Sequence, residues 1–495
     1  MKWRDGLMTN RRSFKTDESF LEKLAIGAIG TRAVFADLLR QGHKPIELER
    51  GSMNYKIWKN IKIKRLRVPD ILCLNCATRI EARAKTNLEI SMSHSLADPE
   101  RGWDKGLTDH DIVSLSICNK FAESPIDWQA ESLIQYVSVR ELRKAFSEKQ
   151  VVIEKPKGAG EGFEVRVTWP SAIASSSGVV KEVTPSRLQF KRDSDGRTIS
   201  LSLSKKSLPL IPLVKTGDAV VAGQIVASVI NVSSSFSCKS NTGKETFLKM
   251  LKSPSVTDRY AAVKALPHFV DYSISQALKE RMNDAREHIY VRLESAAGLV
   301  RLGQGEGIEF IEQTLHGEYL EHRLEGIIIL GEIDLPESQR LLTAVLLDNG
   351  QHPEIRAGAA WALGELQKPD SINTLIQTFT ELAEPIRIEA VRALRKISET
   401  EAARIISKLP DSNEEQRAGM AWAIGKSGHA VIDELLPIMV DEDARRWVAY
   451  ILGTQKKDKY IDQIEALRSY DPEVYFAVTV LWKIIGSWIY NLEEY

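Results

Sequence analysis

The chain has 495 residues, of which 43% are hydrophobic and 27% are charged, and its formal net charge is zero. This composition is typical of a globular protein of about three domains, and it excludes a global affinity for polyanions, so nucleic-acid binding must come from local basic clusters. The sequence contains no run of about twenty apolar residues that would predict a membrane span, and no apolar segment follows its first positive charges. We therefore expect a cytoplasmic protein. Four cysteines are too few for a disulfide framework in so long a chain.

Residues 1–150 are predicted to form an α/β domain. Residues 20–41 have the apolar periodicity of an amphipathic helix, and residues 55–73, 80–93 and 109–118 have the alternation of strands. No acidic residue lies between Glu49 and Asp70, where cations are interleaved with aromatic side chains. This basic run suits a phosphate backbone and stacked bases, although a solvated strand face remains open. Its candidate nucleic-acid-binding residues are Lys56, Trp58, Lys59, Lys62, Lys64, Arg65 and Arg67.

Two carboxylates follow this run. In an extended strand, Glu81, Arg83 and Lys85 share one face. Asp70 lies eleven residues before Glu81, so an antiparallel turn would bring the two carboxylates together. Such a pair can hold Mg²⁺ or Mn²⁺, and the cations beside it can orient a water molecule and stabilise charge on an attacked phosphate. The pattern favours metal-dependent phosphodiester hydrolysis.

The stretch Pro69-Asp70 followed by Glu81-Ala82-Arg83 resembles the motif of the PD-(D/E)xK nuclease superfamily. Its two intervening cysteines, Cys73 and Cys76, are similar to those of Dam-replacing, methyl-directed restriction endonucleases. The resemblance implies that Asp70 and Glu81 bind the catalytic metal and that Lys85 or Arg83 plays the cationic part. Arg83 stands where the family usually has lysine, and an arginine cannot act as a general base.

The same resemblance implies a zinc site at Cys73 and Cys76, which have metal-ligand spacing. Two of four tetrahedral ligands are then missing. His94 and Cys118 are the candidate completing ligands, since Cys238 falls in a polar linker. The alternative is that Cys76 and Cys118 pack as small apolar side chains. In the polar loop that follows, Arg101 is a further candidate DNA contact, whereas Trp103 is more typical of a packed anchor.

Residues 151–232 are predicted to form a small all-β barrel or sandwich, because short β-branched runs alternate with turn signals. The stretch "VKTGDAVVAGQIVASV" resembles the closing hairpin of biotinyl/lipoyl-like domains, but the candidate hairpin tip "KRDSDG" offers no carrier lysine. We expect a structural or binding module. Residues 233–243 are predicted to be a linker.

Residues 244–495 repeat themselves. Arginines recur at intervals of 28 to 33 residues, and a glycine follows four of them by eight residues, where a helix is expected to end. This pattern predicts helix pairs stacked into a solenoid, and it resembles short HEAT-like repeats of the phycobilisome-lyase type. The arginines are expected to bind helix-end carbonyls or acids of the next unit. The minority interpretation is that those nearest the concave surface line a groove for DNA. The repeated arginines are Arg259, Arg292, Arg323, Arg356, Arg387, Arg417 and Arg445.

Two hypotheses follow for the function. The first is a Mg²⁺-dependent DNA endonuclease of a bacterial restriction or phage-defence system, whose solenoid binds DNA or partner proteins such as other defence subunits. The second is a catalytically inactive scaffold, in which the solenoid assembles a multisubunit DNA-binding complex. We favour the first, because a retired site would be expected to lose a costly buried carboxylate.

Overall fold

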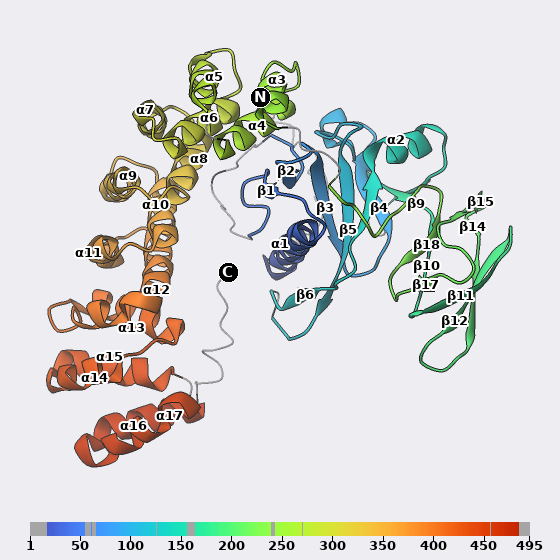
Figure 1. Cartoon of the computed structure of the whole chain (residues 1–495). Coiled ribbons are helices and arrows are strands. Elements are labelled where there is room, and N and C mark those ends of the chain that lie inside the picture. The colour runs from blue at the N-terminus through green and yellow to red at the C-terminus, as the bar shows by residue number, and fades with distance from the viewer. Residues whose placement is uncertain are drawn as a thin grey trace, which may run out of the picture. The chain divides into compact units, whose positions relative to one another are not determined.

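A computed structural model describes residues 17–54, 61, 66–124, 126–155, 164–238, 243–269, 271–455 and 457–484 (Figure 1). Its contacts divide the chain into two compact units that meet in sequence at residues 269 and 270. The first unit is rich in β-strands arranged in several small sheets, and the second is a helical solenoid. None of the described helices is long and apolar enough to span a membrane.

The central sheet of the first unit has the order β1-β2-β3-β5-β6, with β7 also paired to β5. Strands β3 and β5 are parallel, and the other neighbouring strands are antiparallel. The strands are β1 (Pro45–Glu47), β2 (Ile71–Cys73), β3 (Arg79–Lys85), β5 (Ile112–Lys120), β6 (Trp128–Ala130) and β7 (Gln135–Ser138). The strand pair predicted over residues 55–73 is therefore wrong in its described part, where only β2 is extended and its partner β1 lies earlier in the chain.

Helix α1 (Asp17–Arg40) covers one face of this sheet, and it corresponds to the predicted helix. Gly30 allows the close approach, because a Cβ atom there would lie 2.3 Å from the Cβ atom of Ala84 on β3. The alanine face of β3 is thus turned toward α1. Glu81, Arg83 and Lys85 point away from the helix, as the alternation predicts.

A second sheet joins segments that the sequence places in separate domains. Strand β4 (Ile90–Ser95) pairs with β9 (Glu164–Trp169), which pairs with β8 (Val152–Glu154). One hydrophobic core runs across both segments, from Trp103 and Leu142 to Phe190 and Val226. The β-rich middle region therefore shares its core with the N-terminal sheet. The short helices here are η1 (Pro99–Arg101) and α2 (Val139–Ser147).

The rest of the middle region is all-β, as predicted. Its described strands form small antiparallel sheets with the orders β10-β18-β16, β13-β12-β11-β17 and β14-β15. They are β10 (Ser171–Ile173), β11 (Gly178–Val183), β12 (Arg187–Arg192), β13 (Thr198–Ser202), β14 (Ser204–Lys205), β15 (Leu208–Pro209), β16 (Ile211–Pro212), β17 (Ala219–Val220) and β18 (Ile225–Ser228).

Two helices between the β-rich region and the solenoid, α3 (Gly243–Met250) and α4 (Val256–Ala265), group with the first unit, as does η2 (Leu266–His268). Arg79 of β3 explains the attachment of α4. Its buried guanidinium donates to Asp111 at 2.9 and 2.8 Å and to Asp258 of α4 at 3.1 Å. The repeat pattern begins at Arg259, but the first helix pair groups with the β-rich unit.

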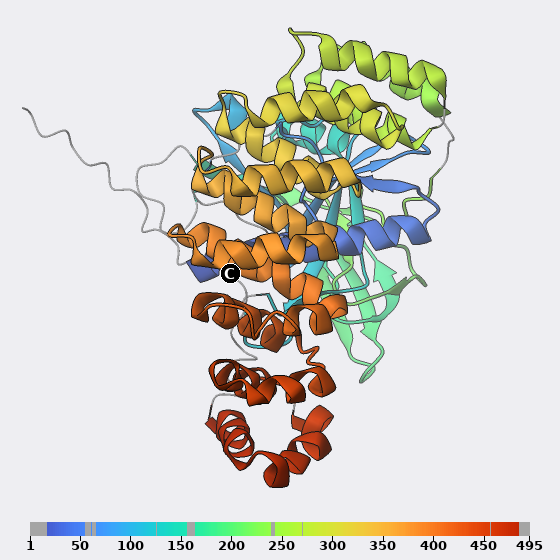
Figure 2. The same cartoon turned by 90° about the vertical axis from the view of Figure 1, so that its left-hand side faces the viewer.

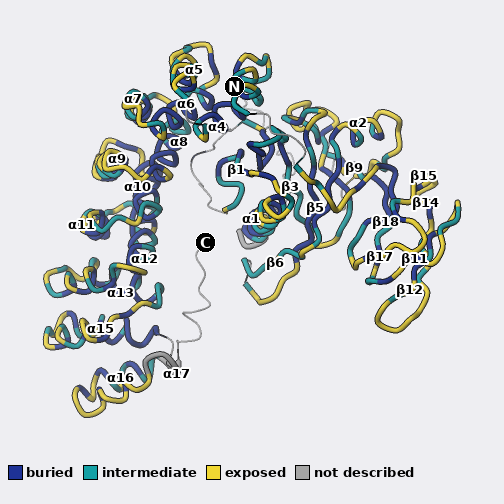
Figure 3. Tube along the Cα trace, viewed as in Figure 1, coloured by how far each residue is buried: buried dark blue, intermediate teal, exposed yellow. Residues whose placement is uncertain are grey.

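The second unit is a stack of helix pairs (Figures 1 and 2). Buried residues concentrate in the row of second helices (Figure 3). The helices are α5 (Tyr272–Asn283), α6 (Ile289–Arg301), α7 (Gly305–Leu315), α8 (Leu320–Gly331), α9 (Pro336–Leu347), α10 (Pro353–Leu366), η3 (Pro369–Ser371), α11 (Ile372–Gln377), η4 (Thr378–Thr380), α12 (Glu384–Ile406), α13 (Glu414–Ser427), α14 (Ile432–Leu435), η5 (Leu436–Val440), α15 (Glu442–Gly453), α16 (Lys457–Tyr470) and α17 (Pro472–Ile484). Helix α12 is broken at Glu401, with φ −116° and ψ 23°, so its last turn serves as the first helix of the next unit.

The repeated arginines fix the turn inside each helix pair. Six of them donate to carbonyl oxygens at or just after the end of the first helix of their unit, as Arg356 does to Leu346 at 2.7 Å. Several also reach an acid of the next unit, such as Glu381 for Arg356 and Asp471 for Arg445. The structural interpretation of these arginines is confirmed.

Two of the four glycines that follow the arginines, Gly331 and Gly453, are the last residues of α8 and α15, as predicted, whereas the other two lie before the ends of their helices. Gly364 lies within α10, and α13 continues past Gly425 to a left-handed Gly428. Their role is close packing between successive second helices. A Cβ atom on Gly364 would lie 2.6 Å from the Cα atom of Ala393, and one on Gly425 would lie 2.4 Å from Thr454 Oγ1.

Candidate functional site

The turn between β2 and β3 brings the predicted carboxylates together. Because Ile71 pairs with Ile80, Asp70 and Glu81 are neighbours across the antiparallel pair. The backbone N–H of Ala82 donates to Asp70 Oδ2 at 2.7 Å, which fixes the orientation of this side chain. Glu81 in turn forms an ion pair with Arg83 at 2.9 Å.

These two carboxyl groups resist ionisation. Burial raises the pKa of Asp70 well above its usual range, and the charges of Glu81 and Glu49 raise it further. Burial also raises the pKa of Glu81, although Arg83 opposes this effect. Adjacent buried carboxylates repel each other, and a divalent cation between them would remove that cost. The arrangement is therefore compatible with a magnesium-binding pair.

Lys85 lies further along the same face of β3. Its Nζ donates to the backbone oxygen of Ser91 at 2.6 Å and to the hydroxyl of Ser91 at 2.7 Å. Burial, followed by repulsion from Arg166, lowers the pKa of Lys85 to about 8. Unlike Arg83, this side chain can exchange a proton near neutral pH.

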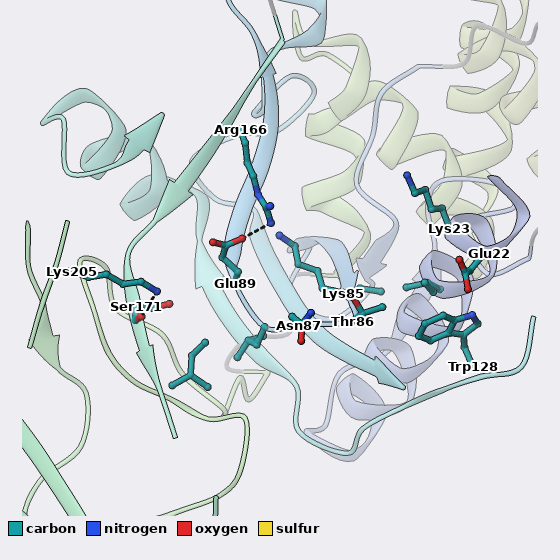
Figure 4. A pocket seen from close by; sticks show the side chains of 14 residues that line it. Glu22, Lys23, Lys85, Thr86, Asn87, Glu89, Trp128, Arg166, Ser171 and Lys205 are labelled. Atoms are coloured by element: carbon teal, nitrogen blue, oxygen red, sulfur yellow. Dashed lines mark hydrogen bonds and ion pairs between the residues drawn. The ribbon is translucent and has the colours of Figure 1, made fainter. Parts of the chain in front are cut away.

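A cavity of about 780 Å³ opens beside the end of β3 (Figure 4). Lys85 and the ion pair of Arg166 with Glu89 line it, and Lys205 of β14 lies across from Glu22 and Trp128. Lys23 also lines the cavity, so four positive side chains face two acidic ones, Glu22 and Glu89. A cavity of this kind can hold an anionic group, but Asp70 and Glu81 do not line it.

A second constellation lies at the opposite end of β2. It consists of His43, Cys73, Cys76 and Cys238, whose possible ligand atoms all lie within 4.8 Å of one another. Within the described residues, it is the one group of three or more His, Cys, Asp or Glu side chains arranged closely enough to hold a metal ion. Cys73 Sγ lies 4.0 Å from Cys238 Sγ, and Cys76 Sγ lies 3.7 Å from His43 Nδ1. Cys73 and His43 are buried. Hydrogen bonds, first from Cys76, lower the pKa of Cys73 to about 3.

Local structure explains how His43 reaches this cluster. Helix α1 ends in a turn in which Gly42 has φ +83°, and the N–H of His43 bonds back to the carbonyl of Leu38 at 3.0 Å. The chain then enters β1, where Pro45 pairs with Cys73. Because β1 and β2 are antiparallel, the residue before β1 meets the turn after β2. His43 therefore faces the two cysteines of that turn.

The other predicted ligands lie elsewhere. His94 Nδ1 accepts a hydrogen bond from the backbone N–H of Trp103 at 3.3 Å, and Cys118 is buried on β5 with its Sγ 3.9 Å from the carbonyl of Ile26. Neither belongs to the cluster, so their assignment as completing ligands of Cys73 and Cys76 is wrong. His43 was not among the predicted ligands, and Cys238 was assigned to the linker.

The predicted nucleic-acid contacts are only partly described. Lys56, Trp58, Lys59, Lys62, Lys64 and Arg65 lie outside the described residues. Arg67 is exposed, and its charge lowers the pKa of Glu81, against the larger effect of burial. Arg101 forms an ion pair with Glu164 at 3.0 Å. Trp103 is buried against Trp169, as expected of an anchor.

Comparison with known proteins defines the class of the second unit. Residues 308–395 match the family model of HEAT repeats. The C-terminal region is therefore a HEAT-repeat solenoid, as the sequence predicts. No curated protein matches the chain.

Several solved structures are similar to about half of this chain. The complex of CpcE and CpcF of phycocyanin lyase from Nostoc is 15% identical, with 49% of this chain and 94% of that chain covered and a TM-score of 0.25. Human deoxyhypusine hydroxylase is 17% identical, with coverage of 45% and 97% and a TM-score of 0.21. A designed armadillo repeat protein in complex with the peptide (KR)4 is 14% identical, with coverage of 49% and 99% and a TM-score of 0.19.

Proposed function

We propose that the protein is a HEAT-repeat scaffold whose solenoid binds a partner protein. Each helix pair buries its apolar faces against its neighbours, and the repeated arginines bind to backbone and neighbouring acids inside the stack. Such a stack presents an extended surface, which is the usual basis of partner binding by helical repeats. Partner binding therefore depends on surface residues outside these internal contacts.

One observation carries this proposal. Large apolar side chains are exposed just before the second helix of several units, where the two helices of a pair are joined. They are Tyr319, Leu382, Val440 and Tyr470, with exposures of 55%, 97%, 81% and 67%. All four lie on the same edge of the solenoid, because each one lies one or two residues before the start of α8, α12, α15 or α17. Apolar residues recurring along one edge are typical of a protein-binding surface.

The test is capture of a partner by the full chain from its native cells, followed by binding measurements with the purified partner. The double variant Leu382→Asp with Val440→Asp is expected to lose at least about 2 kcal/mol of binding free energy, or roughly 30-fold in Kd. Tyr272→Asp is the matched control, because Tyr272 is 88% exposed but begins a first helix and so lies on the other edge. Equal Kd values for all three proteins would contradict the proposal.

A second candidate function is Mg²⁺-dependent hydrolysis of DNA, as in the restriction and defence nucleases that the motif resembles. The supporting observation is the pair of buried Asp70 and partly buried Glu81, with Lys85 on the same strand face. Bound Mg²⁺ would supply charge stabilisation at the attacked phosphate. Asp70 and Glu81 would hold the ion, and Lys85 would orient or deprotonate the attacking water. Arg83 would contribute only fixed positive charge.

This candidate is tested by incubating the full chain with linear and supercoiled DNA in the presence of Mg²⁺, Mn²⁺ or a chelator. Glu81→Gln is expected to abolish metal-dependent cleavage, whereas the control Glu131→Gln, on the far side of β5, should retain it. Cleavage that survives in Glu81→Gln would exclude this site. If the unaltered chain shows no cleavage, the scaffold function stands by itself.

A further inference from the structure

The cluster of His43, Cys73, Cys76 and Cys238 has the dimensions of a four-ligand metal site. For Zn–S bonds of about 2.3 Å and a Zn–N bond of about 2.0 Å, tetrahedral geometry places two sulfurs about 3.8 Å apart and a sulfur and a nitrogen about 3.5 Å apart. The observed separations are 4.0 Å for Cys73 and Cys238 and 3.7 Å for Cys76 and His43. All four ligand atoms lie within 4.8 Å of one another, so binding would require shifts of no more than about 1 Å.

The imidazole of His43 is oriented for ligation. Its Nε2 lies 2.6 Å from the carbonyl oxygen of Phe236, so Nε2 carries the proton and donates. Nδ1 is then left with a free lone pair facing the sulfur of Cys76. A histidine ligand whose second ring nitrogen is bound to a backbone carbonyl is the common arrangement in protein metal sites.

Local hydrogen bonds fix the cysteine turn. The N–H of Cys73 donates to the carbonyl of Thr78 at 2.9 Å, the N–H of Ala77 donates to the carbonyl of Cys73 at 2.9 Å, and the Sγ of Cys76 donates to the Oγ1 of Thr78 at 3.2 Å. Ala77, directly after Cys76, has φ +55°. That conformation is unfavourable for a residue with a Cβ atom, and such strain is found where the surroundings fix a functional geometry.

We propose that these four residues bind a structural zinc ion, and that this ion fixes residues 233–238 to the N-terminal sheet. Three soft thiolates and an imidazole favour zinc over magnesium or calcium, and four protein ligands leave no open position for catalysis. Each thiol that binds loses its proton to solvent. The site is thus separate from the carboxylate pair at the other end of β2.

The attachment is visible in the contacts of the segment that carries Cys238. Ser233 exchanges backbone hydrogen bonds with Tyr136 of β7 at 2.8 and 3.1 Å, and the N–H of Phe236 donates to the side-chain oxygen of Gln41. The ring of Phe236 stacks on His43 at 4.7 Å between centroids. The described part of the predicted linker therefore runs along the N-terminal sheet. The metal ion would attach its C-terminal end, at Cys238, to that sheet.

Elemental analysis of the full chain, purified without chelator under reducing conditions, tests the site. We expect one zinc ion per chain in the unaltered protein and less than a tenth of that in Cys238→Ser and in His43→Gln. Cys118→Ala, which removes a buried thiol outside the cluster, should keep its zinc. Full zinc content in Cys238→Ser would overturn the ligand set.

Two further measurements remain informative even when a variant fails to fold. Chelator-treated unaltered protein, titrated with Co²⁺, should give the strong visible bands of a tetrahedral thiolate site, whereas weak octahedral bands or no binding would overturn the proposal. On chelation, hydrogen exchange should accelerate at the amides of residues 233–238. The factor of acceleration there should be at least ten times the factor in β5. Unchanged exchange in this segment would refute the role assigned to the zinc ion.

Discussion

Replacement of Arg356 by methionine tests whether the repeated arginines stabilise the solenoid. The Arg356 side chain is 7% exposed, and it donates to Leu346 at 2.7 Å and to Glu381 at 2.6 Å. Methionine keeps most of the aliphatic stem but leaves a buried carbonyl and a largely buried carboxylate without their donor. Loss of charged hydrogen bonds costs about 1.5–3 kcal/mol each, and breaking a buried ion pair costs about 3–5 kcal/mol. We therefore expect Arg356→Met to lower the unfolding free energy of the solenoid by about 3–5 kcal/mol.

The matched control is Arg340→Met in the neighbouring first helix. Arg340 is 62% exposed and lies 3.5 Å from Glu312, so its loss should cost about 0–1 kcal/mol. Urea unfolding followed by far-ultraviolet circular dichroism measures both changes, and hydrogen exchange in α9 to α12 assigns them to the solenoid if the two units unfold separately. Equal unfolding free energies for the two variants would refute the reasoning.

Three other perturbations have definite expected outcomes. Gly364→Ala should destabilise the solenoid by about 1–2 kcal/mol in urea unfolding, because overpacking exceeds the gain in helix propensity, whereas Gly305→Ala meets no atom within 4 Å and should be neutral or stabilising. Arg79→Met should speed hydrogen exchange in α4 more than in the solenoid, since Asp258 loses its buried partner. The raised pKa values of Asp70 and Glu81 mean that folding favours their protonated forms, so stability should fall as the pH rises from about 4 toward neutrality. Asp70→Asn with Glu81→Gln should flatten this slope in thermal scans, and Mg²⁺ should raise the Tm of the unaltered protein only.

The solenoid was predictable because its determinants are local. An arginine near the start of each second helix bonds the end of the helix just before it, so both partners lie within about ten residues and recur with the repeat. The spacing of the glycines was also visible in the sequence. Their purpose was not, because Gly364 meets Ala393 of the following unit, and a contact between repeats leaves no separate mark in one sequence.

The carboxylate pair was predictable for a similar reason. Asp70 and Glu81 flank a short turn, and the alternation of β3 assigns the faces of the strand. The His/Cys cluster is different, because Cys238 lies 165 residues from Cys73 and is joined to it by tertiary structure alone. His43 could have been inferred from the glycine that ends α1, had the pairing of β1 with β2 been recognised. The pairing of β4 with β9 across the predicted domain boundary was inaccessible in the same way.

The separation of Cys73 from Cys238 also has a consequence for biosynthesis. At about 5–20 residues per second, the ribosome needs roughly 8–33 s to add the 165 residues between them. During that interval Cys73, Cys76 and His43 have been made, but their fourth partner has not. In the nascent N-terminal domain, Cys73 and Cys76 therefore lack this partner until nearly half of the chain has been synthesised. A C-terminal truncation before residue 238 would make that transient state permanent.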